Sequence, residues 1–239
     1  DAQDRVVRPN WRTKNTEELF VLFVAGQKKK YSKDELIDTF WPRKDLRGAA
    51  HSLHVEISAL RNTLKEVLRS DFDRQRIVVF ANQYYYLNPK VYVSTDVQKF
   101  QQLVNQAAAS MSQTRAKARQ LLGQALDLYR GDFCKEIDAE WCEDIRSYYK
   151  KAILDVLKKL GRIAFEDKSY GESQAFLDRA LSIDDTDESV HVAIMCCRQA
   201  VNDKDGVQRQ YKKLVKTLNR MGISVPSSEA REIYQASLR

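Results

Sequence analysis

The feature that most constrains the fold is a helical-hairpin pattern that recurs at a spacing of 34 residues in the C-terminal half. In residues 160–185, small and apolar side chains are spaced as in two packed helices, with Leu177 and Ala180 at two key positions. A shift of 34 residues carries these onto Tyr211 and Leu214. Because one such hairpin cannot bury its apolar face alone, the pattern predicts two to three hairpins stacked as a short solenoid.

The N-terminal part has a different pattern, which predicts three helices. The first is expected at residues 15–26, with Asn15 as its cap. Ser32 and Glu35 have the spacing of a capping box that opens a second helix, and Pro42 ends it. The third is expected at about 47–69, because apolar residues follow one another there at helical spacing. This apolar stripe comprises Leu53, Ile57, Leu60, Leu64, Val67 and Leu68.

A β-hairpin is expected after the third helix. Residues 77–80 and 84–88 are rich in β-branched and aromatic side chains, and Ala81-Asn82-Gln83 separates them. Tyr84, Tyr85 and Tyr86 alternate between the two faces, so at least one should lie in the core. Three helices and a hairpin are the elements of a winged helix-turn-helix.

Nearly everything after residue 94 is expected to be helical. Gly131 interrupts this part and is expected to adopt a positive φ. The expected helices cover about 96–111, 113–129, 140–166, 170–183, 187–201, 205–221 and 227–237, the first of them capped by Ser94 or Thr95. The fold is therefore predicted to be mainly α, with one domain at 1–92 and an all-α repeat domain at 93–239.

Composition limits the partners and the compartment. The 239 residues carry a net charge of +7, and most of this excess lies in residues 1–92, which fits a polyanionic partner. No run approaches 18 apolar residues, so no membrane span is expected. The four cysteines form no C-x-x-C pair, which favours free thiols in a reducing cytoplasm. The chain begins without Met or a signal-like segment, so we expect a fragment of a longer protein.

The sequence gives little support for catalysis. Its three histidines, His51, His54 and His191, lie in no H-E-x-x-H motif, and its eight glycines form no phosphate-binding loop. We therefore expect no enzyme activity, no metal and no cofactor.

The polar face of the third predicted helix has the chemistry of a DNA-reading surface, since the major groove admits an α-helix. Glu56 opposes this interpretation, because phosphates repel a carboxylate. The candidates for contacts with bases are Ser52, His54, Ser58, Arg61 and Asn62. The candidates for contacts with phosphates or for the wing are Lys28, Lys65, Arg74, Arg76 and Gln83.

Motifs over almost the whole chain resemble the bacterial transcriptional activator domain family, the type found in SARP-like pathway activators. Where relatives are often more basic, the third predicted helix carries Glu56, Ser58 and Ala59. The matching motifs are Trp11-Arg12-Thr13-Lys14, Tyr31-Ser32-Lys33-Asp34-Glu35-Leu36, Trp41-Pro42, Ser52-Leu53-His54-Val55-Glu56-Ile57, Tyr84-Tyr85-Tyr86-Leu87-Asn88, Leu128-Tyr129-Arg130-Gly131-Asp132-Phe133, Trp141 and Gly222-Ile223.

The resemblance implies an OmpR-type winged helix that binds double-stranded DNA, followed by a tetratricopeptide (TPR)-like domain. That second domain is implied to contact RNA polymerase or another protein, or a second copy of the chain. The leading hypothesis is a sequence-specific transcriptional activator in the cytoplasm. The alternative is a protein-interaction module whose winged helix is vestigial and binds no DNA, motivated by Glu56 on the candidate face.

Overall fold

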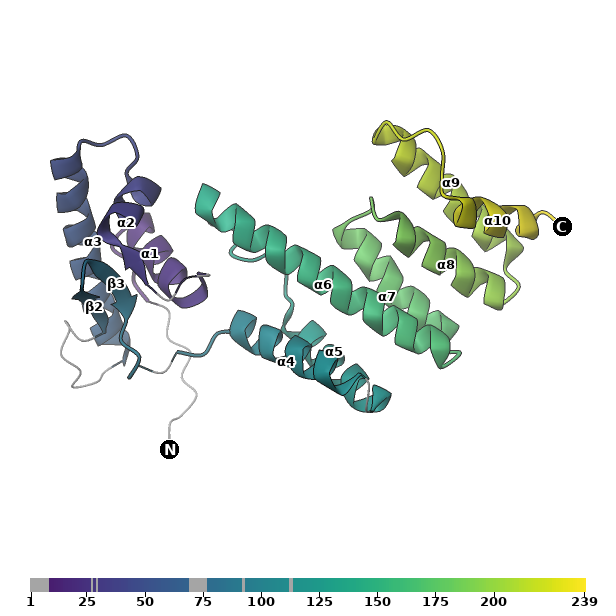
Figure 1. Ribbon diagram of the computed structural model, residues 1–239, viewed down its shortest axis with the longest axis horizontal. Coiled ribbons are helices and arrows are strands. Elements are labelled where there is room, and N and C mark those ends of the chain that lie inside the picture. The colour runs from purple at the N-terminus through teal and green to yellow at the C-terminus, as the bar shows by residue number, and fades with distance from the viewer. Residues whose placement is uncertain (1–8, 27, 29, 69–76, 92, 112–113) are drawn as a thin grey trace. The chain divides into compact units, whose positions relative to one another are not determined.

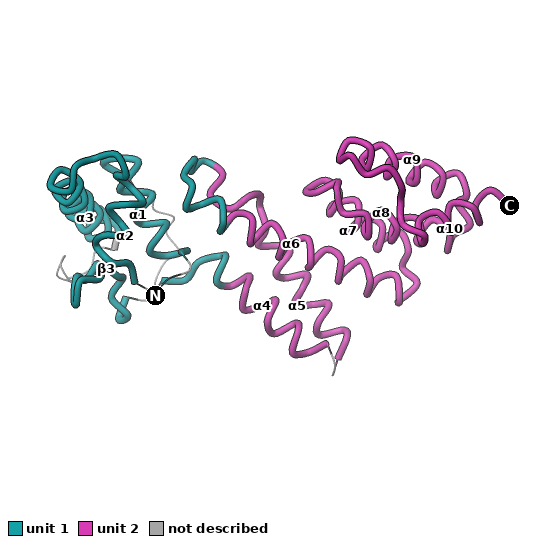
Figure 2. The backbone as a smooth tube through the Cα atoms, turned by 45° about the horizontal axis from the view of Figure 1, so that its top comes forward, with its two compact units in different colours: residues 1–98, 136–145 teal, residues 99–135, 146–239 magenta. Residues whose placement is uncertain are grey.

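The computed structural model describes residues 9–26, 28, 30–68, 77–91, 93–111 and 114–239. They are mainly helical and include one small sheet (Figure 1). The chain forms two compact units, shown in Figure 2: residues 1–98 with 136–145, and residues 99–135 with 146–239. The domain boundary after residue 92 stays a prediction.

The first unit contains the three N-terminal helices expected from the sequence. They are α1 (Lys14–Ala25), α2 (Lys33–Phe40) and α3 (Leu46–Leu68). The capping box of α2 is confirmed: the Ser32 hydroxyl accepts from the Glu35 backbone N–H, and the Glu35 carboxylate accepts from that of Ser32. The cap expected for α1 was wrong by two residues, because the Thr13 side chain accepts from the Thr16 backbone N–H.

The sheet has three antiparallel strands in the order β1-β3-β2. Strand β2 (Val78–Ala81) and strand β3 (Tyr84–Leu87) are the predicted hairpin. Asn82 and Gln83, at φ 52° and 68°, form a two-residue turn, which suits the twist of paired strands better than the three-residue connection expected. Strand β1 (Tyr31–Ser32) was not predicted, since two residues are too few to show alternation.

The core of the first unit lies between α3, the two preceding helices and the sheet. Tyr85 is 2% exposed and faces inward, as expected for one of the three tyrosines. Of the predicted apolar stripe, Val67 is half-buried, and the side chain of Leu68 lies outside the described part. The buried members of the stripe are Leu53, Ile57, Leu60 and Leu64.

The second unit is built from helices that pack as successive pairs, as the sequence pattern predicts. None of the helices in the described ranges is both long and apolar enough to cross a membrane. The helices after the sheet are α4 (Asp96–Ser110), α5 (Arg115–Leu128), α6 (Glu140–Glu166), α7 (Tyr170–Ile183), α8 (Glu188–Ala200), α9 (Lys204–Arg220) and α10 (Ser228–Ser237). Between α5 and α6, Gly131 adopts φ +145°, as expected.

Helices α6 and α7 approach each other closely at Gly161. A Cβ atom at this position would lie 3.1 Å from the Leu177 side chain, a tight contact. The Ser173 hydroxyl donates to the Gly161 carbonyl at 2.7 Å, so α7 also binds the α6 backbone here. Gly161, Ser173 and Leu177 therefore mark the contact between the two helices.

This contact gives a stability prediction with a matched control. Gly161→Ala and Gly123→Ala both replace a mid-helix glycine, which by itself stabilises by about 0.5–1 kcal/mol. An alanine at position 123 meets no atom within 4 Å, whereas one at 161 crowds Leu177. We expect Gly161→Ala to have a free energy of unfolding about 1–3 kcal/mol below that of Gly123→Ala, measured by chemical denaturation. Equal effects of the two substitutions would contradict the close contact.

Candidate nucleic-acid interface

Helix α3 divides into a buried face and a polar face. Its buried side chains pack in the core of the first unit. Ser52 is half-buried, and its hydroxyl donates to the Gly48 carbonyl at 3.0 Å and accepts from Lys44 Nζ at 3.0 Å. Solvent-exposed side chains on the polar face are His51, His54, Ser58, Asn62 and Lys65. Three of the five predicted base-facing residues, His54, Ser58 and Asn62, thus share this face with Lys65.

Arg61 lies differently, because its side chain turns toward the sheet. Its Nε and Nη2 atoms donate to the Val78 carbonyl of β2 at 2.9 Å and 2.6 Å. The side chain is half-buried, and loss of hydration lowers the pKa of its guanidinium below the ordinary value. Arg61 thus connects α3 to the hairpin by charge-assisted hydrogen bonds.

Glu56 also has a partner inside the unit. The Thr13 hydroxyl donates to its carboxylate at 2.6 Å, and the Thr16 hydroxyl donates to the same oxygen. Both threonines belong to the N-terminal turn of α1, where the helix dipole favours a negative charge. The sequence offers no signal for this contact, since 43 residues separate Thr13 from Glu56. The carboxylate of Glu56, which in the sequence argues against DNA binding, is therefore hydrogen-bonded to the start of α1.

The hairpin presents its turn to solvent. Asn82 and Gln83 are exposed at the tip, and the Gln83 carbonyl accepts from the Lys33 backbone N–H at 3.2 Å. Arg74 and Arg76, the other predicted wing residues, lie outside the described residues. The amide side chains at the tip have both donors and acceptors for a phosphate or a base edge.

Lys28 is exposed but paired with a carboxylate. Its Nζ lies 2.5 Å from Glu35 Oε1, at the N-terminus of α2. The hydrogen bond and the negative charge of Glu35 raise the pKa of Lys28, and the pKa of Glu35 is lowered by the same contact. A phosphate would have to compete with this carboxylate.

A basic segment at the start of α3 was missed as a candidate. Arg43, Lys44 and Arg47 are all exposed, and Asp45 caps the helix by accepting from the Gly48 backbone N–H at 2.9 Å. Leu46, the first residue of α3, is 77% exposed. Three cations within five residues at the start of the polar helix are the signal that could have identified them.

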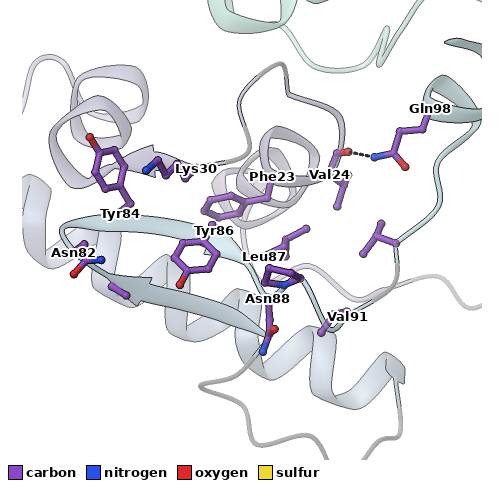
Figure 3. A pocket seen from close by; sticks show the side chains of 13 residues that line it. Phe23, Val24, Lys30, Asn82, Tyr84, Tyr86, Leu87, Asn88, Val91 and Gln98 are labelled. Carbon is purple, nitrogen blue, oxygen red and sulfur yellow. Dashed lines mark hydrogen bonds between the residues drawn. The ribbon is translucent and has the colours of Figure 1, made fainter. Parts of the chain in front are cut away.

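A hollow of about 620 Å³ lies beside the sheet in the same unit. Figure 3 shows Phe23, Tyr86 and Leu87 among the side chains around it, and Lys30 Nζ lies 4.5 Å from the centre of the Tyr84 ring. Gln98 Nε2 donates to the Val24 carbonyl at 3.4 Å. The lining is mostly apolar and brings no acid and base together, so we assign it no chemistry.

The second unit has a groove that could receive a protein partner. Its volume is about 420 Å³, and it is lined by side chains of α6, α7, α8 and α10. Lys158 is one of its lining residues, and its Nζ lies 2.9 Å from an Asp187 carboxylate oxygen. Phe165, Leu177 and Val190 contribute apolar surface. Such a surface can accept an apolar side chain from a peptide.

The described residues contain no cluster of histidines, cysteines and carboxylates that could hold a metal ion. His191 is buried, with Nδ1 2.8 Å from Gln210 Nε2 and Nε2 3.0 Å from the Asp185 carbonyl, so it serves packing between helices. No disulfide joins the four cysteines, and burial raises the pKa of Cys196 and of Cys197.

Comparisons with known proteins agree with the helical part of the description. The chain is similar to EmbR of Mycobacterium tuberculosis, solved in complex with a low-affinity phosphopeptide, at 18% identity and a TM-score of 0.79. The similarity covers 96% of this chain and 60% of the EmbR chain, so this chain spans less than two thirds of that protein. At this identity, the likeness shows a shared fold.

A second solved structure is the C-terminal TPR-containing domain of an FK506-binding protein from Plasmodium falciparum. It is 16% identical, with a TM-score of 0.46, and the match covers 62% of this chain and 93% of the other. At this TM-score it supports no inference. No curated protein matches the sequence closely enough to serve as a relative.

The sequence profile described as the bacterial transcriptional activator domain matches residues 95–238, which is more than half of the chain. The match begins at α4 and includes every helix of the second unit. The chain therefore belongs to the bacterial transcriptional activator domain family.

Proposed function

We propose that this chain is a transcriptional regulator that binds duplex DNA through a winged helix in its first unit. In this proposal, α3 is the recognition helix and the β2–β3 hairpin is the wing. The observation that carries it is the polar, exposed face of α3, which has basic residues at both ends. Membership of a transcriptional activator family and the fold likeness to EmbR support the same role.

The size of α3 fits the major groove, which is about 12 Å wide and admits one α-helix. Within the groove, His54, Ser58 and Asn62 would face base edges, because they are successive residues of one exposed stripe. Lys65 would neutralise a phosphate at one end of the helix. Arg43 and Arg47 would do so at the other end.

Arg61 receives a different role from the one first expected. Its hydrogen bonds to the Val78 carbonyl favour it as a positioning residue that sets the hairpin against α3. Ser52, which is bonded to Gly48 and Lys44, would likewise orient the lysine more than read a base. Gln83 at the turn, with Arg74 and Arg76, would then reach the sugar–phosphate backbone.

The second unit would recruit a protein partner, with RNA polymerase as the first candidate for an activator. The groove between α6 and α8 supports this, since its lining combines apolar and charged side chains. EmbR was solved with a phosphopeptide, which motivates a peptide as a partner of such proteins. The family points to a regulatory protein that is not an enzyme, acting in the cytoplasm.

A specific observation favours the alternative of an interaction module without DNA binding. Among the described exposed side chains on the face from His51 to Lys65, only one is a lysine or arginine, and that is Lys65 itself. Capture of a partner protein by the full chain, without DNA binding at about 50 mM salt, would support this alternative.

Substitutions on α3 test the direct reading of bases. His54→Ala should cost about 1–3 kcal/mol of binding to the preferred duplex and less on other sequences, because a base contact is lost. The measurement is a fluorescence-anisotropy titration of a preferred and a scrambled duplex. The matched comparison is His51→Ala, which replaces the other exposed histidine of the same helix. A His54→Ala variant that loses affinity equally on both duplexes would exclude a base-specific role.

Lys65→Ala should weaken binding to all duplexes alike, because a lysine near the end of α3 contacts phosphate and not a base. The slope of log K against log salt should become shallower by about 1. Titrations at four salt concentrations measure the slope. An unchanged slope would place Lys65 away from the DNA.

Arg61→Ala separates positioning from base contact. Loss of two charge-assisted hydrogen bonds, leaving the Val78 carbonyl without its partner, should lower the free energy of unfolding by about 1–3 kcal/mol. Binding should weaken while the preferred sequence stays the same. Chemical denaturation and selection of the bound sequences give the two measurements. Unchanged stability together with an altered preferred sequence would instead make Arg61 a base-reading residue.

A further inference from the structure

Helix α9 concentrates positive charge in a part of the chain that is otherwise acidic. Six of its 17 residues are lysine or arginine and one is acidic. Outside α9, residues 93–239 contain slightly more acidic than basic residues. The charge of this helix is therefore a local feature of the second unit.

Five of these cations gather on one side of the helix. At 100° per residue, they fall within an arc of about 100°, and all five are exposed. They are Arg209, Lys212, Lys213, Lys216 and Arg220. The neighbouring side of the helix is buried against the unit through Gly206, Val207, Gln210, Leu214, Thr217 and Leu218.

The two ends of this basic face have carboxylate partners. Arg220 contacts Asp185 at 2.7 Å, and Arg209 lies 3.9 Å from Asp203. For Lys212, Lys213 and Lys216, no carboxylate of the described residues lies within 4.0 Å of the ammonium group. Like charges three and four residues apart on a helix destabilise it, so this arrangement has a cost that an anionic partner would remove.

We propose that the basic face of α9 binds the phosphate backbone of duplex DNA. The row from Arg209 to Arg220 is about 16 Å long at 1.5 Å per residue, and duplex DNA carries one negative charge per about 1.7 Å of axis. Lysine ammonium groups bind phosphate as point charges and read no bases. Such a face adds affinity without specificity, and it extends the DNA contact of the proposed regulator, on whose function this inference rests.

The test compares two triple variants of the full chain that remove the same charge. One is Lys212→Gln/Lys213→Gln/Lys216→Gln. The control is Lys99→Gln/Lys117→Gln/Lys151→Gln, which removes three exposed lysines from other helices of the same unit. Both should keep the wild-type circular dichroism spectrum, because all six side chains are exposed. Anisotropy titrations with one duplex at several salt concentrations give the affinity and the salt slope.

The α9 variant should bind about tenfold more weakly at low salt, and its slope should be shallower by roughly 2 to 3. The control should bind nearly as the wild type does. Equal affinities and equal salt slopes of the two variants would overturn the inference. It would also be overturned if the α9 variant lost binding to anionic phospholipid vesicles but bound DNA as the wild type does.

The same titrations distinguish this inference from the proposed function. If Lys65→Ala and His54→Ala have no effect but the α9 variant does, α9 binds DNA and the winged-helix proposal fails. If the α3 variants weaken binding and the α9 variant matches its control, only the inference about α9 fails. Absence of DNA binding by the wild-type chain would overturn both.

Discussion

The position of α3 depends on two sets of hydrogen bonds made by ionised side chains. Glu56 accepts from the threonines at the start of α1, and Arg61 donates to the Val78 carbonyl of β2. Bonds with a charged partner are stronger than neutral ones and specify direction, which apolar packing alone does not. The buried stripe holds α3 in the core, and these polar contacts fix its rotation. Rotation decides which side chains reach the solvent.

The second unit relies on a different constraint, the close approach of helix backbones. Gly161 allows α7 to lie against α6, and the Ser173 hydroxyl bonds to the backbone that the glycine exposes. Charged side chains add a contact nearby, where Arg119 of α5 bonds to Glu172 of α7. The groove of this unit results from the stacking of helical hairpins. Each hairpin presents a surface that the next hairpin in the array covers.

The sequence predicted those features that depend on neighbours in the chain. The helices, the Ser32–Glu35 capping box and the apolar stripe of α3 follow from local spacing, and the structure has them. Strand β1 was missed because it exists only through its pairing with β3. The partners of Glu56 and Arg61 were missed for a similar reason, since spacing along one helix carries no information about α1 or β2. Of the candidate residues on α3, His54, Ser58, Asn62 and Lys65 are exposed, whereas Arg61 and Ser52 make internal hydrogen bonds.

As a transcriptional regulator, the chain should bind duplex DNA and select among sequences. The most direct measurement is an anisotropy titration of the wild-type chain with a random-sequence duplex pool at two salt concentrations, followed by sequencing of the bound fraction. We expect binding that weakens as salt rises, because phosphate contacts release counterions, together with enrichment of a repeated sequence. Salt-sensitive binding without enrichment would mean that a basic surface of the chain binds DNA without selecting a sequence. Absence of binding at low salt would contradict the account and favour the interaction module.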